Sequence, residues 1–507
     1  MSTTADPRLN EIVSLDQVDH CLIHDDDQVV VLLQDSPGGI PAGHKIARSD
    51  IRPGQPIRKY GEPIGVATRP IRSGQWVHTH NLISGLSERL DVPDLQTAHA
   101  PEIRSFPGLP QTFNGFVRNN GQVGVRNEIW VIPTVCCVNQ TANLLAEYGR
   151  SCLNHIRQES PDSQIDTVTA WTHPWGCSQL GDDLNQTRQL LQSLTLHPNA
   201  GGVLVLGLGC ENNQLDEFRD TLPPYDPQRV RFLQAQDVSD ELAAGRDLID
   251  QLIRTASEDR REACSFEHLT IGLKCGGSDG FSGLTANPLL GRVSEWLISQ
   301  GGSALLTEVP EMFGADQVLL ARTADHEVAK ALAGLLQSYR DEYTRHGQPV
   351  DKNPSPGNQA GGLSTLEDKS LGCTQKAGRS LITDVLPYAG RRRRQGLSVV
   401  AGPGNDAIAC TALAAAGAQI ILFTTGRGTP LGGPVPTMKI ASTDQLAQLK
   451  PHWIDFSAGS ILGRNGADPE MDAAMIRQMI DVTNGRKAKN EQNGYREISL
   501  LKQGVIL

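Results

Sequence analysis

The chain has 507 residues, of which 38% are hydrophobic and 20% charged, with 46 Lys and Arg against 57 Asp and Glu. This length predicts two or three domains, and the 51 glycines point to a globular protein rich in tight turns. The formal net charge of −11 argues against a surface for nucleic acid or an anionic membrane. An anionic ligand would therefore need a locally cationic pocket.

The first fifteen residues, MSTTADPRLNEIVSL, lack the basic flank and apolar core of a signal peptide. No run approaches the roughly 20 apolar residues of a membrane span. We therefore expect a cytoplasmic protein. The ten cysteines are scattered through glycine-rich stretches, unlike the dense framework of a small secreted domain, so reduced thiols are expected.

Residues 1–92 predict a small β-rich domain. An apolar run at residues 28–33 is followed by the turn sequence at residues 36–39, and glycines recur at short intervals after it. Residues 93–114 contain prolines at positions 93, 101, 107 and 110 and have no helical or strand periodicity. This segment predicts an extended linker.

From residue 115 onward, apolar strand-like runs alternate with helical patterns, which is typical of a largely parallel sheet buried between helices. The expected strands are residues 129–135, 202–207, 269–273, 304–309, 397–401 and 419–425, and the expected helices include residues 238–256 and 326–346. We place a boundary near Gly390, which divides a central α/β domain (115–390) from a C-terminal α/β domain (391–507). The arginine run at residues 391–394 predicts a solvated segment, with an anion-binding or interface role as the alternative.

Several expected strands end in glycines and ionisable residues, where open α/β sheets bind their ligands. Residues 207–213 and 274–280 each follow a strand, and Asn358, residues 372–376 and residues 402–406 lie in loops of similar composition. Glycines let the backbone approach a ligand, and the polar side chains supply hydrogen-bond partners. One such loop alone is more often a tight connection, and residues 402–405 lack a phosphate-loop or dinucleotide fingerprint. We therefore expect no nucleotide.

Histidines of the first block are candidate metal ligands. On an extended strand, residues i and i+2 point to the same face, so His78 and His80 could share one ion, with His44 as a further candidate. Surface histidines on a small β domain would give the same pattern, and both interpretations stay open. Cys136 and Cys137 are adjacent and would face opposite ways on a strand. The cysteines lack compact iron–sulfur spacing, so buried, inert thiols are the expectation for most of them.

Short motifs run in order along nearly the whole chain. They are residues 40–45 (IPAGHK), 59–65, 77–82 (VHTHNL), 115–118, 124–127, 133–139 (PTVCCVN), 173–179 (HPWGCSQ), 207–211, 274–283 (KCGGSDGFSG), 286–288 and 372–378. This ordered set resembles the altronate/galactarate dehydratase family, and its first members resemble the SAF-like domain of that family. Cys136 is a departure, because a glycine is expected at that place in the family motif.

The resemblance implies an α/β multidomain protein with an N-terminal SAF-like β domain, a central α/β domain and a Rossmann-like C-terminal domain without a nucleotide. It also implies a metal-dependent dehydratase that converts an aldonate such as altronate, or an aldarate such as galactarate, to a 2-keto-3-deoxy acid. Ferrous iron is the expected metal and manganese the alternative. The histidine pair resembles altronate dehydratase more closely, which favours an aldonate.

Two other functions remain alternatives. Split relatives of the same architecture cleave sulfite from 3-sulfolactate, so a sulfo-lyase is one. A non-catalytic sugar-acid-binding protein is the other, and the many ionisable groups at strand ends argue against it. A homodimer is expected on base rates.

Dehydration of a 2,3-dihydroxy acid removes a proton from C2 and hydroxide from C3, so the site needs a base, an acid and a cation. We expect His78, His80 and then His44 to bind the metal. The catalytic candidates are Glu211, its rival His173, and Lys274. The candidates for binding the substrate are Lys45 and Arg118 for its carboxylate, and Ser278, Asp279 and Asn287 for its hydroxyls.

Overall fold

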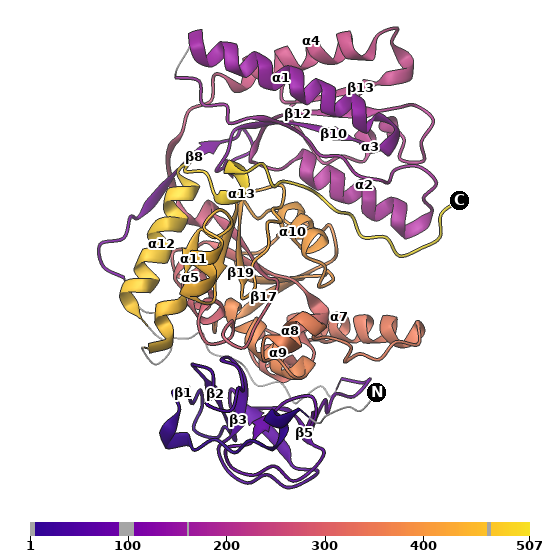
Figure 1. Cartoon of the computed structure of the whole chain (residues 1–507). Coiled ribbons are helices and arrows are strands. Elements are labelled where there is room, and N and C mark those ends of the chain that lie inside the picture. The colour runs from indigo at the N-terminus through magenta and orange to yellow at the C-terminus, as the bar shows by residue number, and fades with distance from the viewer. Residues whose placement is uncertain (1–5, 91–105, 160–161, 464–467) are drawn as a thin grey trace.

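The computed structural model describes residues 6–90, 106–159, 162–463 and 468–507. Its domains lie in a row, with the N-terminal β domain at one end, the central domain at the other and the C-terminal domain between them (Figure 1). Within these described ranges, no helix is both long and apolar enough to pass through a membrane.

The N-terminal domain consists of two small antiparallel sheets, which confirms the predicted β-rich domain. The strand orders are β1-β2-β3-β6 and β4-β5-β7. The strands are β1 His20–Cys21, β2 Val29–Leu32, β3 Lys45–Ala47, β4 Pro56–Lys59, β5 Glu62–Ala67, β6 Trp76–Val77 and β7 Leu82–Ile83. All of β2 is buried, and its adjacent residues Val29 and Val30 point to opposite faces and enter two different hydrophobic clusters.

Only part of the predicted linker at residues 93–114 can be compared with the structure. Residues 93–105 lie outside the described residues. Residues 112–114 already belong to strand β8 (Thr112–Val117), so the prediction of a linker up to residue 114 is wrong at that end. Strand β8 pairs with β9 (Val123–Gly124) and β14 (Glu262–Ser265) in a small antiparallel sheet.

The central domain is built on a parallel sheet with the order β11-β10-β12-β13. Its elements are β10 Glu128–Pro133, α1 Asn139–Glu159, β11 Val168–Ala170, α2 Gly181–Thr195, β12 Ala200–Gly207, α3 Leu215–Asp220, β13 Val230–Gln234 and α4 Glu241–Ala256. Helices α1 and α4 cover one face and α2 and α3 the other, so β10 is buried throughout and β12 nearly so (Figure 1). The expected strands at 129–135 and 202–207 and the expected helix at 238–256 are confirmed.

The C-terminal domain contains a fully parallel sheet of seven strands in the order β17-β18-β16-β15-β19-β20-β21. Its strands are β15 Thr270–Cys275, β16 Ser303–Leu306, β17 Ile382–Leu386, β18 Gly396–Val400, β19 Ile420–Thr425, β20 Thr437–Ala441 and β21 Phe456–Ser457. Its helices are α5 Ala286–Ser299, α6 Asp316–Leu320, α7 His326–Arg345, α8 Pro356–Ala360, α9 Leu366–Cys373, α10 Asp406–Ala415, α11 Asp444–Leu449, α12 Pro469–Thr483 and α13 Lys489–Gln492. The remaining expected strands and the expected helix at 326–346 are confirmed.

The predicted domain boundary near Gly390 is wrong, because it falls inside this sheet. Strand β18 follows the boundary and pairs with both β16 and β17, which precede it. The architecture changes instead between β14 and β15, where the chain enters the seven-stranded sheet.

The arginine run at residues 391–394, beside that position, fits both of its interpretations in part. Arg393 and Arg394 are exposed. Arg391 reaches into the central domain and donates to the Leu196 carbonyl and to Gln122 Oε1, both at 3.2 Å. Half of the run is therefore solvated, and Arg391 contributes to a domain interface.

In each parallel sheet, the strand that comes first along the chain lies in the interior of the sheet and not at its edge. In the central sheet β10 has β11 on one side and β12 on the other, and in the C-terminal sheet β15 lies between β16 and β19. The connections that follow such a strand and its neighbour then run over opposite faces of the sheet, which opens a crevice at the carboxyl ends of the two strands. The fold therefore provides two positions where a ligand site is expected.

Candidate functional site

A cleft of about 360 Å³ lies at the carboxyl ends of the seven-stranded sheet. It is lined by Cys275, Gly276, Gly277, Glu311, Lys352, Asn353, Ser355, Asn358, Lys369, Gly404 and Asp406. These residues come from the loops after β15, β16 and β18, from the segment between α7 and α8, and from α8, α9 and the start of α10. Segments far apart in the sequence thus converge at the switch point of the sheet, where β15 begins the domain.

Lys274, predicted as a catalytic residue, lies beneath this cleft in a buried ionic network. Its ammonium group pairs with Glu308, and with Asp406 Oδ1 at 2.7 Å. Lys376 Nζ lies 2.9 Å from the other Glu308 oxygen. Burial lowers the pKa of Lys274, but Glu308 and Asp406 raise it further, and the result lies well above its ordinary value. Lys274 is therefore held as a fixed positive charge.

A second ion pair lines the cleft itself. Lys369 Nζ donates to Glu311 Oε1 at 2.8 Å and to Asn353 Oδ1 at 3.0 Å. Burial raises the pKa of Glu311, and the nearby ammonium groups of Lys369 and Lys274 lower it below its ordinary value. An ionised carboxylate and a cationic donor therefore lie side by side on the wall of the cleft.

Two buried thiols and a hydroxyl form the floor. Ser278 Oγ lies 2.8 Å from Cys275 Sγ and 3.8 Å from Cys373 Sγ. A hydrogen bond from Cys373 lowers the pKa of Cys275, burial opposes that shift, and the positive charge of Lys376 reinforces it. Ser278, predicted to bind substrate, is thus next to the cleft and bonded to a sulfur atom that lines it.

Asp279 and Asn287, also predicted to bind substrate, lie at this end of the sheet but hold the loops together. Asp279 accepts from the Ser282 backbone at 2.8 Å and from Ser442 Oγ at 2.9 Å. Asn287 donates to the Gly372 carbonyl at 3.0 Å and accepts from Thr424 Oγ1 at 2.6 Å. The structure therefore brings Lys274, Ser278, Asp279 and Asn287 to one end of the sheet. The polar groups of Asp279 and Asn287 are already hydrogen-bonded to the backbone and to neighbouring side chains.

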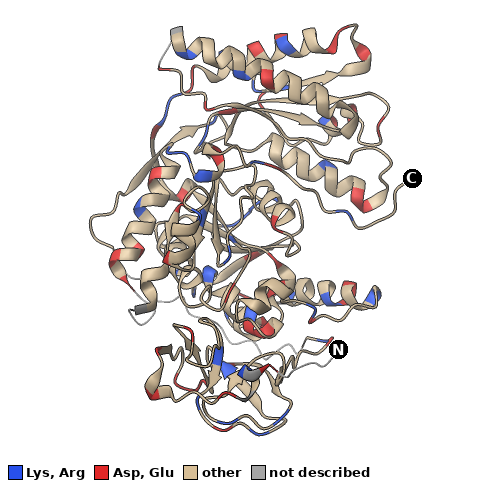
Figure 2. Ribbon diagram, viewed as in Figure 1, with Lys and Arg blue, Asp and Glu red and all other residues tan. Residues whose placement is uncertain are grey.

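Lys45, predicted to bind the substrate carboxylate, joins two domains instead. Its Nζ donates to the Gly362 carbonyl at 2.8 Å, Ser364 Oγ at 2.9 Å and Asp368 Oδ2 at 2.7 Å. An ammonium group has three donors, so none is left for a substrate. Figure 2 shows basic and acidic residues facing each other where the N-terminal domain meets the C-terminal domain.

The three histidines predicted as metal ligands gather around Trp76, but they do not form a three-ligand site. Strand β6 ends at Val77, so His78 and His80 lie in a turn and the expected alternation along a strand does not apply. The ring centroid of Trp76 lies 5.3 Å from His44, 5.4 Å from His78 and 5.2 Å from His80. Among the described residues, no three His, Cys, Asp or Glu side chains are placed to hold a metal ion.

The hydrogen bonds of these rings explain the misfit. His44 Nδ1 accepts from Trp76 Nε1 at 3.1 Å, and His44 Nε2 lies 3.4 Å from the Ala360 carbonyl. His78 Nδ1 lies 2.8 Å from Ser364 Oγ. Burial lowers the pKa of His44 to about 4, of His78 to about 3 and of His80 to about 4. The rings are neutral, as metal binding requires, but His44 has both nitrogens engaged, so the predicted triad does not fit a divalent ion.

Glu211 and His173, the rival candidates for the acid/base, lie in the central domain and not beside Lys274. Glu211 accepts from Thr134 Oγ1 at 2.8 Å and from the Leu208 backbone at 3.0 Å, and it also accepts from the Gly209 backbone. His173 Nε2 lies 2.8 Å from the Pro133 carbonyl, and burial lowers its pKa to about 4. Both therefore belong to the loops at the carboxyl ends of the central sheet.

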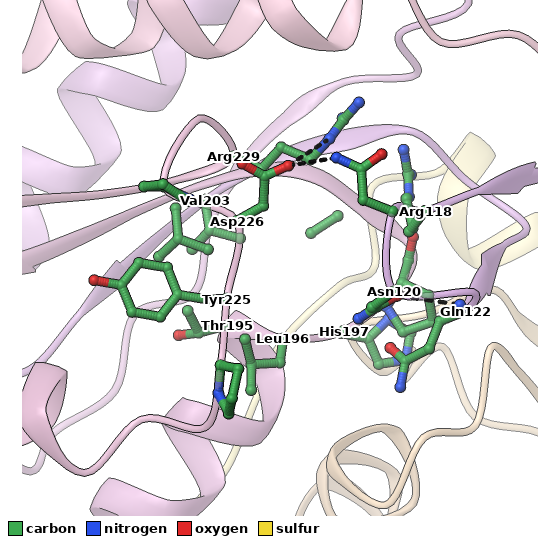
Figure 3. A pocket seen from close by; sticks show the side chains of 16 residues that line it. Arg118, Asn120, Gln122, Thr195, Leu196, His197, Val203, Tyr225, Asp226 and Arg229 are labelled. Carbon is green, nitrogen blue, oxygen red and sulfur yellow. Dashed lines mark hydrogen bonds and ion pairs between the residues drawn. The ribbon is translucent and has the colours of Figure 1, made fainter.

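Arg118 lies beside a different cavity, of about 400 Å³, at the amino ends of the central strands. Figure 3 shows this cavity between Arg118, Asn120, Tyr225 and Arg229. Arg118 donates to Asp259 at 2.8 Å, to the Pro198 carbonyl at 2.9 Å and to Asn127 Oδ1 at 3.1 Å. Its donors are therefore used inside the domain, and the structure does not bring it to the cleft.

The sequence prediction missed Glu308, Glu311 and Lys369. The two glutamates directly follow β16, and this strand-end position was the available signal. Lys369 lies within α9, every residue of which is buried. That helix offers no amphipathic pattern, so the sequence does not mark its polar residues as inward-facing.

Family models match most of the chain. The altronate/galactarate dehydratase SAF domain matches residues 18–85, the second domain of D-galactarate dehydratase/altronate hydrolase matches residues 115–257, and the C-terminal domain of D-galactarate/altronate dehydratase matches residues 266–506. The limits at 257 and 266 agree with the passage from the central to the seven-stranded sheet.

Relatives of known name match over more than nine tenths of the chain. The chain is 46% identical over 503 residues to altronate dehydratase of Bacillus subtilis, which covers 96% of this chain and 99% of the relative. It is 46% identical to altronate dehydratase of Escherichia coli over 95% of this chain and 94% of the relative. It is 31% identical to galactarate dehydratase (L-threo-forming) of Escherichia coli over 92% of each.

A SAF domain packed on the second of two α/β domains, a charged cleft at a strand switch point and these matches define a carbon–oxygen lyase that removes water. The chain belongs to the altronate/galactarate dehydratase family.

Proposed function

We propose that this protein removes water from an aldonate of the altronate type and yields a 2-keto-3-deoxy acid. The identity to two altronate dehydratases is 46%, against 31% to a galactarate dehydratase. The observation that carries the proposal is the Glu311–Lys369 pair on the wall of the cleft. It combines a base and a cation, which the elimination needs, in a cavity of about 360 Å³.

The chemistry can be assigned to residues of the cleft. Lys352 lines the cleft and offers a positive charge to the substrate carboxylate. Glu311 takes the C2 proton, and Lys369 donates a hydrogen bond to the oxygen on which the enediolate charge develops. The C3–O bond then breaks, and Glu311 returns the proton to the departing hydroxide, which leaves as water. The remaining enol rearranges to the 2-keto acid.

The buried network beneath the cleft positions these groups. Lys274 contributes a fixed charge below the reacting atoms, and Glu308 and Asp406 prevent it from moving. Fixed charges in a site shielded from water stabilise developing negative charge without reorganisation. This role differs from proton transfer, because the pKa of Lys274 is too high for the proton to leave near neutral pH.

A requirement for ferrous or manganous ion stays a prediction. The predicted histidine triad does not fit such an ion, so no step is assigned to it. The cytoplasmic location and the homodimer also stay predictions.

An anaerobic assay tests the proposal. The purified protein is incubated with altronate, galactarate or 3-sulfolactate, with and without ferrous or manganous ion and with a chelator control, while 2-keto acid and sulfite are measured. We expect keto acid from altronate, and a loss of kcat of about 10²–10⁴-fold in Glu311→Gln. Glu295→Gln is the matched control, because Glu295 is also buried but lies on α5 outside the cleft. Product from galactarate alone, sulfite from 3-sulfolactate alone, or full activity of Glu311→Gln would overturn the assignment.

A further inference from the structure

Four cysteines lie at the carboxyl ends of the central parallel sheet, away from the cleft. Cys136 and Cys137 follow β10, Cys177 follows β11 and Cys210 follows β12. These three strands are neighbours, in the order β11-β10-β12. Helix α1, which follows β10, and helix α3, which follows β12, cover opposite faces of the sheet, so the thiols lie at the second switch point of the molecule.

Hydrogen bonds fasten the three cysteine-bearing loops to one another. The Cys136 backbone donates to the Trp175 carbonyl at 2.9 Å, and the Asn213 backbone donates to the Gly176 carbonyl at 3.0 Å. Asn213 Nδ2 donates to the Thr134 carbonyl at 3.1 Å. The second loop therefore bonds to both of the others, and the first and third bond directly to each other.

The contact is tight enough to require glycine. A Cβ atom added at Gly176 would lie 2.0 Å from the Thr134 carbonyl oxygen, and the φ of Gly176 is +103°. Two residues on, Ser178 has a φ of +57°, a left-handed conformation that costs about 1–3 kcal/mol for a residue with a side chain. The fold thus presses the Cys177 loop against the Cys136–Cys137 loop at an energetic cost.

Cys137 is the centre of the group, because Cys136, Cys177 and Cys210 all lie close enough to act on its thiol. Cys137 and Cys210 are exposed, and Cys136 and Cys177 are half-buried. All ten cysteines of the chain are free. This accessible group differs from an inert core thiol such as Cys410, which is fully enclosed and whose pKa burial raises to about 12.

The spacing of the cysteine side chains distinguishes a single zinc ion from an iron–sulfur cluster. A single zinc ion holds its sulfur ligands at about 2.3 Å from one point. No three metal-binding side chains of the described residues converge in that way. An iron–sulfur cluster distributes its thiolates over several iron atoms, so its ligands stand farther apart. Soft thiolate ligands also favour such a cluster.

We propose that Cys137, Cys177 and Cys210, one from each loop, bind an iron–sulfur cluster at the carboxyl edge of the central sheet. Cys136 lies beside them. The weak hydrogen bonds to sulfur, from Gln236 Nε2 to Cys210 at 3.7 Å and between Ser178 Oγ and Cys177 at 3.8 Å, are contacts of the kind that tune a cluster. The ligands are far apart in the sequence because three different strands supply them, so compact spacing is not required.

The test measures the cluster directly. The full-length protein is prepared anaerobically with ferrous iron and sulfide, desalted, and analysed for iron, acid-labile sulfide, visible absorption and electron paramagnetic resonance after reduction. We expect iron and sulfide in similar amounts, a broad visible band that bleaches in air, and loss of both in Cys137→Ser, Cys177→Ser and Cys210→Ser. Cys152→Ser is the matched control, since Cys152 is half-buried on α1 of the same domain and outside the group.

Circular dichroism and the melting temperature of the metal-free variants establish that each is folded. Absence of acid-labile sulfide from the wild-type protein, binding of zinc without sulfide, or retention of the cluster in all three loop variants would overturn the proposal. These readouts do not depend on turnover. Failure of the cluster and failure of the dehydratase assignment are therefore distinguishable.

Discussion

The Asp368 carboxylate lies between Lys45 and Lys59, at 2.7 and 2.9 Å, and all three side chains are almost completely buried. Burial raises the pKa of Asp368, but the two ammonium groups lower it far below its ordinary value. The two lysines belong to the N-terminal domain and the aspartate to α9. One residue thus balances two buried charges at a domain interface.

We expect Asp368→Asn to destabilise the protein by about 3–5 kcal/mol, because it leaves two buried ammonium groups without a counter-charge. Thermal and urea unfolding would measure the change. Asp216→Asn is the control, since its pair with Arg219 is 79% and 45% exposed and should be worth less than about 1 kcal/mol. Equal stability of the two variants would contradict the interpretation of Asp368.

For single residues, the sequence predicted where the site lies better than it predicted what each side chain does there. Lys274 and Ser278 were found because they lie at the end of a buried strand and in the glycine-rich loop that follows it. Glu311 and Lys369 were missed because their pairing joins a strand-end turn to the interior of a helix, 58 residues apart. Lys45 was placed in the wrong role, since a sequence does not show that a partner domain occupies all three donors of a lysine.

At the scale of elements, the loop after β15 and the turn before β3 touch through glycines. A Cβ atom added at Gly280 would lie 2.0 Å from the Gly43 carbonyl oxygen. Gly280 also donates its backbone N–H to the Gly361 carbonyl at 2.7 Å. The N-terminal domain therefore approaches the cleft loop as closely as backbone atoms allow.

We expect Gly280→Ala to lower stability by about 1–3 kcal/mol, because the added methyl group forces the two loops apart. It should also lower the activity of the cleft that this loop borders. Gly334→Ala is the control: nothing lies within 4 Å of its added Cβ atom, it is in α7, and alanine there should stabilise the helix by up to about 1 kcal/mol. Melting curves and kcat of both variants are compared. A neutral effect of Gly280→Ala would show that the contact can relax.

The long buried strands were predicted well because parallel strands covered on both faces are apolar throughout. The turn after β6 was not. Its sequence alternates as a strand would, yet the strand ends at Val77, and Asn81 Oδ1 accepts from the His78 backbone at 2.9 Å to form the turn. A local side-chain hydrogen bond thus replaced the expected extended backbone.

At the scale of the whole molecule, buried neutral histidines make stability depend on pH. Burial, Lys45 and His44 lower the pKa of His78 to about 3, although Asp368 raises it, and an unfolded histidine titrates near 6.5. The unfolded chain therefore binds more protons between about pH 3 and 6.5. The contribution to stability is complete above about pH 6.5 and is lost as the pH falls.

We expect the melting temperature to fall between pH 7 and pH 5, and His78→Gln to weaken that dependence. Other histidines with pKa lowered by burial, such as His173 and His197, keep part of it. His155→Gln is the control, because His155 is exposed on α1. Identical pH profiles for His78→Gln and His155→Gln would contradict the role of His78.

The overall architecture followed from alternating strand and helix patterns, but the domain boundary did not. Composition changes near Gly390, where arginines interrupt the pattern, while the sheet continues across that point through the pairing of β17 with β18. Pairing between distant strands decides where a domain ends, and local sequence carries little information about it.

The docking of the N-terminal domain includes Lys45 and Lys59 on Asp368 and Gly43 against Gly280. These contacts join parts of the chain that are far apart in the sequence. A covalent connection adds to such an interface by raising the effective concentration of one domain at the other, commonly to about millimolar. Were the same two parts made as separate polypeptides, this interface alone would have to provide the affinity that the connection now makes unnecessary.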